Sequence, residues 1–392
     1  MFDEFLTHNA SIMTTIRLLT TCALLLLLLS GCAEIVANRI LHGGSNGGGT
    51  PFPKPLQDSL PIAHLNIVRV QQDPAIDLAV WVLEPHHCQV WTGNGDIAIP
   101  NGWVVAGKVR CDLVDHGPSA KVYPFNFRWF QEKPGTNMTP AGTVILLQGQ
   151  GGCARTSPLL LFALVLADAG YRVVMPDLRS QGDSTGKELG FIVKDAQDVS
   201  KILDWLQREH LLAGRVGIFG HSYGAAVAGY AAAKDDRIAT CIVSGGPTNW
   251  RKVIQYQGRE SLLWRLMSDR QRERAFQICS EKMGYDIDSL DGCKLITSTD
   301  KPVLLLHGRK DKNVPVALAL AAYEARPKNT RLVIFEEAGH YDYLMTDFER
   351  VRKLCLDWFA EHLRPPTETA PSQPATTAST SATAPVERGR TP

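Results

Sequence analysis

The stretch that decides the fold is Arg215-Val216-Gly217-Ile218-Phe219-Gly220-His221-Ser222-Tyr223-Gly224, and the alanine-rich run Ala225-Ala226-Val227-Ala228 follows it. An apolar strand leads into a serine between two glycines, and a helix comes next. A serine on so sharp a turn projects its Oγ above the sheet, and crowding there requires small residues at Gly220 and Gly224. The bare pattern also occurs by chance in loops. The strand before it and the helix after it favour a nucleophile at Ser222.

A serine nucleophile needs a base, and the base needs an orienting carboxylate. Two apolar runs downstream of Ser222 end close to such residues. Asp311 follows Val303-Leu304-Leu305-Leu306, and His340 follows Leu332-Val333-Ile334-Phe335. Both are therefore expected in loops at the sheet edge that carries Ser222. The alternative interpretations are a solvated loop acid for Asp311 and a structural histidine for His340.

The rest of the chain predicts an α/β fold class. After Gly142, short runs that are apolar on both faces alternate with amphipathic helical patterns, which is typical of a doubly wound, mostly parallel sheet. Residues 78–83, 103–107 and 123–130 predict N-terminal antiparallel strands. Residues 247–299 have helical spacing and predict a cap over the carboxyl ends of the strands. Six apolar cap residues either line an acyl pocket or pack the cap onto the core: Trp250, Leu262, Leu263, Trp264, Leu266 and Met267.

Together these motifs resemble the α/β-hydrolase superfamily, and their pattern is nearest to the monoacylglycerol-lipase and serine-aminopeptidase-like group. The matching stretches are Gly220-His221-Ser222-Tyr223-Gly224, His307-Gly308-x-x-Asp311 with Val314-Pro315, Gly339-His340, and Asp177-Leu178-Arg179-Ser180-Gln181-Gly182-Asp183-Ser184. The resemblance covers about residues 123–363 and implies the α/β-hydrolase fold. We expect His221 and His307 to be hydrogen-bonding residues rather than bases, and Asp177 and Arg179 to form an internal ion pair that shapes the site rather than to be catalytic groups.

The oxyanion hole is expected to use two backbone N–H groups. That of Tyr223 lies at the start of the helix after Ser222 and points toward an oxyanion on a bound carbonyl. The resemblance implies a second donor, the N–H of Gln150. The chain departs from the family motif in the loop that carries Gln150, because Gln148-Gly149 replaces the family's usual His-Gly. A backbone donor survives such a change, whereas the shape of the loop and the choice of substrate depend on it.

We therefore expect a serine hydrolase, most simply a carboxylesterase or lipase-like enzyme with the triad Ser222, Asp311 and His340 and with no metal or organic cofactor. Two alternatives keep the same triad: an aminopeptidase or amidase, and an acyltransferase. A third is a non-catalytic surface lipoprotein that uses the fold as a scaffold. The 41 Lys and Arg residues against 40 Asp and Glu leave a net charge of +1, so no nucleic-acid partner is expected.

Residues 1–31 resemble a bacterial lipoprotein signal peptide. The run Leu24 to Leu29 is too short to span a bilayer, and Leu29-Ser30-Gly31-Cys32 is similar to a lipobox. The resemblance implies a lipidated Cys32, a membrane anchor and a place in the cell envelope, with Ala33 favouring the outer over the inner membrane. The alternatives are an uncleaved anchor helix and a plain secretory peptide. We expect a flexible tether over residues 32–61, a hydrolase domain over 62–364 and a disordered tail over 365–392.

The nine cysteines fit an oxidising compartment. By proximity along the chain we pair Cys88 with Cys111, across strands that flank the Gly93-Asn94-Gly95 turn, and Cys279 with Cys293 inside the cap. A closed loop of about 15 residues would be worth roughly 3 kcal/mol. Three others, Cys153, Cys241 and Cys355, are interpreted as buried small hydrophobes. The sequence has no C-x-x-C spacing, so a structural zinc site is not expected.

Overall fold

The structure is a computed structural model that describes residues 31–41, 63–93, 103–112, 122–130, 138–155, 157–246, 249–292, 294 and 298–363. Residues 1–30 of the expected signal peptide, residues 42–62 of the expected tether and its junction, and the expected tail lie outside the described residues.

The centre of the molecule is an eight-stranded sheet in the order β1-β2-β7-β6-β8-β9-β10-β11. Neighbours from β7 to β11 are parallel, whereas β1 pairs with β2, and β2 with β7, in antiparallel fashion. The strand bounds are β1 (Ala63–Gln71), β2 (Ile76–Leu83), β6 (Thr143–Leu147), β7 (Arg172–Pro176), β8 (Val216–His221), β9 (Ile238–Ser244), β10 (Val303–Gly308) and β11 (Thr330–Phe335). Every residue of β6, β8 and β10 is buried, as expected for strands covered on both faces. The predicted fold class is confirmed.

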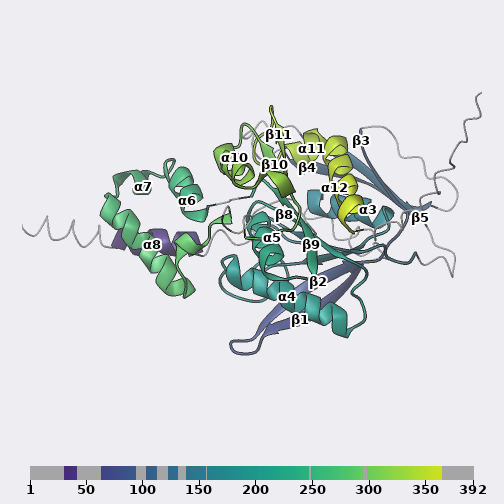
Figure 1. The fold of residues 1–392 in the computed structure, drawn as a ribbon, viewed down its shortest axis with the longest axis horizontal. Coiled ribbons are helices and arrows are strands. Elements are labelled where there is room, and N and C mark those ends of the chain that lie inside the picture. The colour runs from purple at the N-terminus through teal and green to yellow at the C-terminus, as the bar shows by residue number, and fades with distance from the viewer. Residues whose placement is uncertain are drawn as a thin grey trace, which may run out of the picture.

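Helices cover both faces of this sheet (Figure 1). One hydrophobic cluster joins the sheet to α4 (Val193–Arg208) and α5 (Tyr223–Lys234), and the other joins it to α3 (Ser157–Asp168) and α12 (Phe348–Leu363). Two further helices, α10 (Val316–Ala325) and α11 (Tyr343–Thr346), flank the last strands, together with the short turn η3 (Pro327–Asn329). The parallel strands are thereby buried between two layers of helices, with the loops at their carboxyl ends on one edge.

A second, three-stranded antiparallel sheet has the order β3-β5-β4, with β3 (Cys88–Thr92), β4 (Trp103–Asp112) and β5 (Val122–Phe130). Its β5 packs on the α3 and α12 side of the molecule, where the rings of Phe125 and Phe348 have centroids 5.0 Å apart. The sequence predicted strands at β4 and β5 and a strand at Cys88 before the Gly93-Asn94-Gly95 turn, where β3 lies, but it did not predict β1.

The predicted disulfide of Cys88 with Cys111 is wrong. Cys88 is a buried free thiol. It stands opposite Trp129 of β5, whereas Cys111 stands opposite Tyr123, so β5 separates the two cysteines and their levels along it differ by six residues. Strands two apart in a sheet lie about 9–10 Å from each other, beyond the Cα separation that a disulfide allows.

The predicted disulfide in the cap is wrong as well. Cys279 is a buried free thiol whose Sγ lies 3.8 Å from the carbonyl oxygen of Ala37, and its expected partner Cys293 lies outside the described residues. Cys241 and Cys355 are buried free thiols, as expected, whereas Cys153, interpreted from sequence as buried too, is only half-buried. Burial raises the pKa of Cys279 and of Cys355 to about 12, so both stay protonated at neutral pH.

A helical cap lies between β9 and β10, as predicted. It consists of α6 (Trp250–Gly258), α7 (Leu262–Leu266), α8 (Asp269–Met283) and the turn η2 (Ile287–Ser289). Each helix begins at a side-chain cap, from Asn249, Ser261 and Ser268 respectively, because these side chains accept a first-turn N–H. Figure 1 shows the three helices grouped at one end of the molecule.

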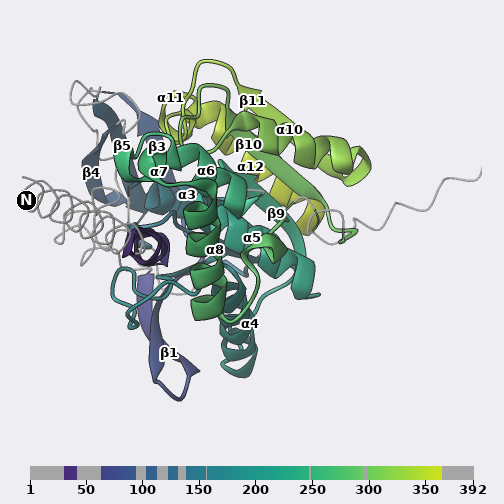
Figure 2. The ribbon, with the colours of Figure 1, turned by 90° about the vertical axis from the view of Figure 1, so that its left-hand side faces the viewer.

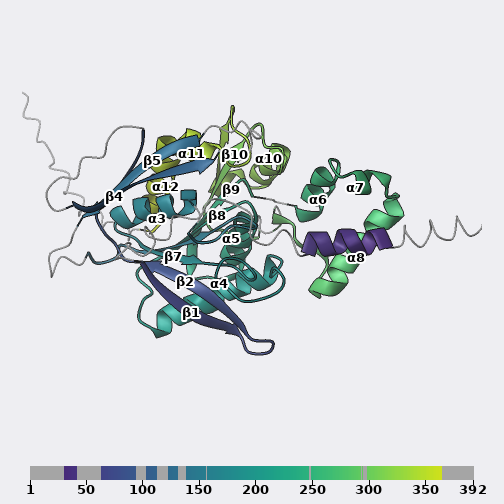
Figure 3. The same ribbon diagram turned by 180° about the vertical axis from the view of Figure 1, so that it is seen from behind.

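Residues 31–41 form a helix that lies beside α8 (Figure 3). This corrects the expectation of a flexible tether for residues 32–41, because Ala33, Val36, Ala37 and Leu41 turn a buried apolar stripe toward the cap. Cys32, the expected lipidation site, is half-buried in this helix. Within the described residues, no helix has the length and apolar character needed to cross a bilayer.

Candidate active site

The three residues predicted as a triad follow three parallel strands. Ser222 comes directly after β8, Asp311 lies three residues past β10, and His340 lies five residues past β11. Carboxyl ends of parallel strands share one edge of the sheet, so residues separated by up to 118 positions can meet there. The loops also bind each other directly, since the N–H of Lys310 donates to the carbonyl of Ala338 over 2.9 Å.

The three side chains form one hydrogen-bonded line. His340 Nε2 lies 2.8 Å from Ser222 Oγ, and His340 Nδ1 lies 2.7 Å from Asp311 Oδ2. Both distances are within hydrogen-bond range for proton transfer between a nucleophile, a base and its orienting carboxylate. The arrangement can therefore remove the hydroxyl proton of Ser222 as the oxygen attacks a carbonyl.

The Asp311 carboxylate is held in its ionised form. Burial opposes its charge, but hydrogen bonds from His307 and His340 and from backbone N–H groups outweigh burial and hold its pKa well below the ordinary value. Its Oδ1 accepts the N–H groups of Asn313 and Val314, each over 2.8 Å. His307 Nε2 lies 3.2 Å from Oδ2 and 2.9 Å from the Val314 carbonyl. Both carboxylate oxygens are thus fixed by the acid loop before they orient His340.

His221, which precedes the nucleophile, supports the site from beneath. Its Nδ1 lies 3.1 Å from Ser244 Oγ, which in turn lies 2.6 Å from the hydroxyl of Tyr343. Its ring packs 5.1 Å from the ring of His340. Burial, with the nearby His340 next in effect, lowers the pKa of His221 well below its ordinary value. A neutral imidazole therefore packs against His340 and adds no competing positive charge.

The turn at Ser222 has the strain that the sequence predicts. Ser222 has a φ of 53°, a left-handed value that L residues with side chains rarely adopt. A Cβ at Gly220 would lie 2.1 Å from the Gly224 carbonyl oxygen, and one at Gly224 would lie 2.4 Å from the Gln148 carbonyl oxygen. Only glycine fits at these two positions, and the close approach brings the loop after β6 against the nucleophile.

That loop carries the second expected oxyanion donor. In the amide orientation that satisfies both partners, the side chain of Gln148 donates to the Pro176 carbonyl and accepts the Leu178 N–H, each over 3.0 Å. Gln148 thereby ties the loop after β6 to the end of β7. Gln150 and Tyr223 line the same pocket as Ser222, and the N–H of Tyr223 in the first turn of α5 has no intrahelical acceptor.

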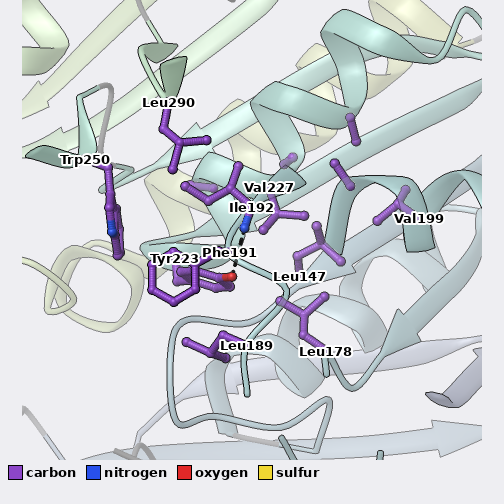
Figure 4. Close-up of a cluster of buried hydrophobic side chains, with 14 of the residues drawn as sticks. Leu147, Leu178, Leu189, Phe191, Ile192, Val199, Tyr223, Val227, Trp250 and Leu290 are labelled. Atoms are coloured by element: carbon purple, nitrogen blue, oxygen red, sulfur yellow. Dashed lines mark hydrogen bonds between the residues drawn. The ribbon is translucent and has the colours of Figure 1, made fainter. Parts of the chain in front are cut away.

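The side chain of Tyr223 anchors the start of α5 in a buried polar network that sequence reasoning missed. Its hydroxyl donates to Asp195 Oδ2. The same oxygen accepts the N–H of Ile192 over 3.0 Å, the bond drawn in Figure 4. Phe191 and Ile192 have φ values of 50° and 67°. Tyr285 of the cap donates to the Phe191 carbonyl, so the network links the nucleophile turn to the cap. Asp195 reads in the sequence as an ordinary helix-surface acid, and no local pattern reveals its burial.

The loop after β7 differs from its expected ion pairing. Arg179 binds the buried Asp198 through two nitrogens, one of them 2.8 Å from Asp198 Oδ1, rather than Asp177. Asp177 instead accepts backbone N–H groups, from Ala154 over 2.5 Å and from Asp183 over 2.8 Å. Asp177 therefore shapes the loop through the backbone, because its carboxylate replaces missing main-chain acceptors.

A cavity of about 720 Å³ opens at Ser222. It extends from the nucleophile beneath α6 and α7, so the cap lies over the carboxyl edge of the sheet. Four of the six cap residues considered from sequence line it, namely Trp250, Leu262, Leu263 and Trp264. The other two do not line it: Met267 is buried in the hydrophobic core, and Leu266 is exposed.

The sequence is similar to proteins named as peptidases. A model of the X-Pro dipeptidyl-peptidase (S15) family matches residues 118–269. The uncharacterized peptidase YuxL of Bacillus subtilis is 28% identical over 214 residues, which are 51% of this chain and 31% of that protein. The chain thus spans less than a third of the length of that relative.

Solved structures extend the likeness over most of the chain. An esterase from Pyrococcus furiosus has a TM-score of 0.54 at 17% identity and covers 82% of this chain and 98% of its own. An acylaminoacyl peptidase from Pyrococcus horikoshii has a TM-score of 0.51 at 17% identity, over 81% of this chain and 45% of its own. The fold is shared, and the names divide between ester and peptide hydrolysis.

Proposed function

We propose that this chain, a member of the α/β-hydrolase superfamily and a serine hydrolase of the esterase or peptidase kind, cleaves carboxylic esters through an acyl-enzyme on Ser222. The observation that carries the proposal is the unbroken line from Asp311 through His340 to Ser222, with heavy-atom distances of 2.7 and 2.8 Å. The finer group named from the motifs, monoacylglycerol-lipase and serine-aminopeptidase-like, stays a prediction.

In the proposed mechanism Ser222 Oγ attacks the ester carbonyl while His340 Nε2 takes its proton. Asp311 keeps the proton on Nδ1 of the neutral ring and stabilises the imidazolium that forms. The N–H groups of Tyr223 and Gln150 bind the oxyanion, and one such donor is worth about 2.7–4 kcal/mol of the barrier. His340 then protonates the leaving alcohol, and water repeats the sequence on the acyl-enzyme.

The pocket supports an ester with an apolar acyl group. Its volume lies within the usual range for small-molecule sites. Side chains of Trp250, Val253 and Ile254 on α6 line it beside Ser222. Its charged lining residues, Arg39 and Glu260, are both exposed, so their charges belong to the mouth rather than the interior.

A fluorophosphonate probe tests the mechanism directly. The purified protein should be labelled on Ser222, and Ser222→Ala should lose both the label and the hydrolysis of p-nitrophenyl esters. Equal labelling of the two proteins, or labelling of neither, would contradict the proposal and favour a non-catalytic scaffold. Product analysis with an added alcohol separates hydrolysis from acyl transfer, because a transferase would form the new ester.

Peptide hydrolysis is the second candidate, since the matched family model and the Bacillus relative are both named as peptidases. The same triad would serve an amide, with His340 protonating the leaving amine. Aminoacyl and X-Pro p-nitroanilides, assayed beside p-nitrophenyl esters on one preparation, distinguish the two. A kcat/KM for an anilide above that for every ester would replace the ester proposal.

We also propose that Cys32 carries a lipid anchor in the bacterial cell envelope. The support is the lipobox-like Leu29-Ser30-Gly31-Cys32 and the apolar run before it. Metabolic labelling with an alkynyl fatty acid tests this. The full chain should take up label and sediment with the outer membrane, and Cys32→Ala should do neither. Absence of label on the unaltered chain would contradict the anchor.

A further inference from the structure

The helix of residues 31–41 is docked firmly on the cap. Small residues, Ala33 and Ala37, lie one turn apart on its buried stripe and let it approach α8 closely, with the Ala37 carbonyl 3.8 Å from Cys279 Sγ. Lys282 of α8 adds two polar contacts, to Glu34 over 3.1 Å and to Asn38 over 2.6 Å. The helix and α8 are adjacent in every view (Figures 2 and 3).

The same helix also lines the pocket at Ser222, with residues on and beside its buried stripe. Ile35, Val36 and Ile40 contribute to the lining together with α6, α7 and the loop after β6. Ile35 is 58% exposed and therefore belongs to the mouth, whereas Val36 is buried and Ile40 is half-buried. The pocket is thus completed by a segment that precedes every strand of the hydrolase fold.

From this placement we infer that the helix of residues 31–41 is a wall of the acyl-binding pocket and that Ile40 sets the size of the acyl group accepted. The inference rests on the proposed ester hydrolysis and adds the determinant of its substrate class. The apolar chain of an acyl group bound to Ser222 extends between α6 and this helix, where Ile254 and Ile40 contact it. No polar partner for the chain is needed, since contact area and excluded water supply the affinity.

Two substitutions at Ile40 change the pocket in opposite directions. Ile40→Phe fills it and should lower kcat/KM for long-chain p-nitrophenyl esters relative to p-nitrophenyl acetate by about tenfold, the scale that one methylene commands in an apolar pocket. Ile40→Ala enlarges it and should shift the preferred chain to a longer one. Ile254→Ala, on α6, should shift the preference too. Ile67→Ala, an exposed isoleucine on β1, is the matched control and should change nothing.

Docking of the helix is measured separately, by maleimide labelling of Cys279. In the full chain Cys279 should be protected, and it should stay protected in both Ile40 variants. Ala37→Trp cannot be accommodated against α8 because Ala37 is fully buried. That variant should expose Cys279 to the reagent and lose discrimination by chain length, while fluorophosphonate still labels Ser222.

The outcomes separate this inference from the proposed function. An unchanged chain-length preference in both Ile40 variants, with Cys279 still protected, would overturn the inference and leave the serine hydrolase intact. Free labelling of Cys279 in the unaltered chain would overturn it as well, because the helix would then not be docked. Absence of fluorophosphonate labelling in the unaltered chain would instead refute the proposed function.

Discussion

At the scale of single residues, Asp311 is the sharpest test of the triad. Asp311→Asn keeps the size of the side chain but removes its charge, so His340 loses its orienting carboxylate and the preference for a proton on Nδ1. We expect kcat to fall by about 10⁴-fold, as in other triads. Hydrolysis of p-nitrophenyl esters measures this fall in kcat. Labelling of Ser222 by the fluorophosphonate should slow in parallel. A loss below tenfold would mean that His340 is oriented by other groups.

Asp195 makes the folding free energy depend on pH in the opposite sense to most carboxylates. Burial, followed by repulsion from Asp198, outweighs the hydrogen bond from Tyr223 and the attraction of Arg179, and raises the pKa of Asp195 to about 6. A raised folded pKa means that the folded state holds the proton more tightly than the unfolded state. This stabilisation is complete below pH 4 and is lost as pH rises through about 6.

Asp195→Asn removes that dependence while its amide oxygen still accepts from Tyr223. Urea unfolding of both proteins between pH 4 and 8 should show the unaltered chain losing stability relative to Asp195→Asn, most steeply near pH 5 at up to about 1.4 kcal/mol per pH unit, with the loss levelling off above pH 6. Asp236→Asn, at a fully exposed side chain, is the control. A difference that stays constant with pH would show that Asp195 does not titrate in this range.

At the scale of elements, the β8 to α5 turn depends on its glycines. Gly224→Ala would place a Cβ 2.4 Å from the Gln148 carbonyl oxygen, which is backbone that has to move, so the loop after β6 and the oxyanion hole would be displaced together. We expect loss of activity by at least about 10²-fold, the cost of losing one oxyanion donor. Far-ultraviolet circular dichroism of the soluble fraction shows whether the rest of the fold survives.

The matched control lies in the same helix. A Cβ at Gly229 of α5 would meet the Val243 side chain at 3.9 Å, an ordinary contact. Gly229→Ala should therefore leave activity unchanged and raise stability by up to about 1 kcal/mol, the difference in helix propensity. If both alanine variants behaved alike, the effect of Gly224→Ala would reflect the helix rather than the turn.

Elements with a local signature were predicted well from sequence. The buried strands β6 to β11 show as apolar runs, and Ser222, Asp311 and His340 follow three of them, so the triad could be assigned before any geometry was known. Strand pairing has no such signature. The turn at Gly93-Asn94-Gly95 suggested that β3 pairs with β4, but β5 lies between them, and the disulfide of Cys88 with Cys111 failed for that reason.

Contacts of high sequence separation explain the other omissions. The helix of residues 31–41 follows directly on the leader-like leucine run, and only its contact with α8, some 240 residues later, shows it to be part of the folded molecule. Asp195 likewise becomes a buried acid only because Tyr223 and Tyr285 meet the segment before it. Local sequence motifs therefore identify the reacting side chains of the site. The residues that surround these side chains and shift their properties can be identified only from the tertiary structure.

At the scale of the whole molecule, the cap contacts the sheet domain, but the sheet lies at the centre of the fold and the cap at its edge. Trp250 packs on Tyr223 and Phe191, with centroid distances of 5.8 and 6.4 Å, and Tyr285 binds the Phe191 carbonyl. Cys241 lies at the centre of β9, whereas Cys279 lies between α8 and the helix of residues 31–41. Both thiols are fully buried, so each reports the opening of its own region.

We expect the cap to open more readily than the sheet, because a few helices held by side-chain contacts unfold locally at lower free energy than central strands. Under native conditions both buried thiols should react far more slowly than an exposed thiol, and over long exposure maleimide should label Cys279 before Cys241, as followed by peptide mass spectrometry. After unfolding without a reductant, both should react at once, since each is a free thiol. Equal native rates would show that the cap opens only with the sheet, and access to the pocket would then depend on its open mouth alone.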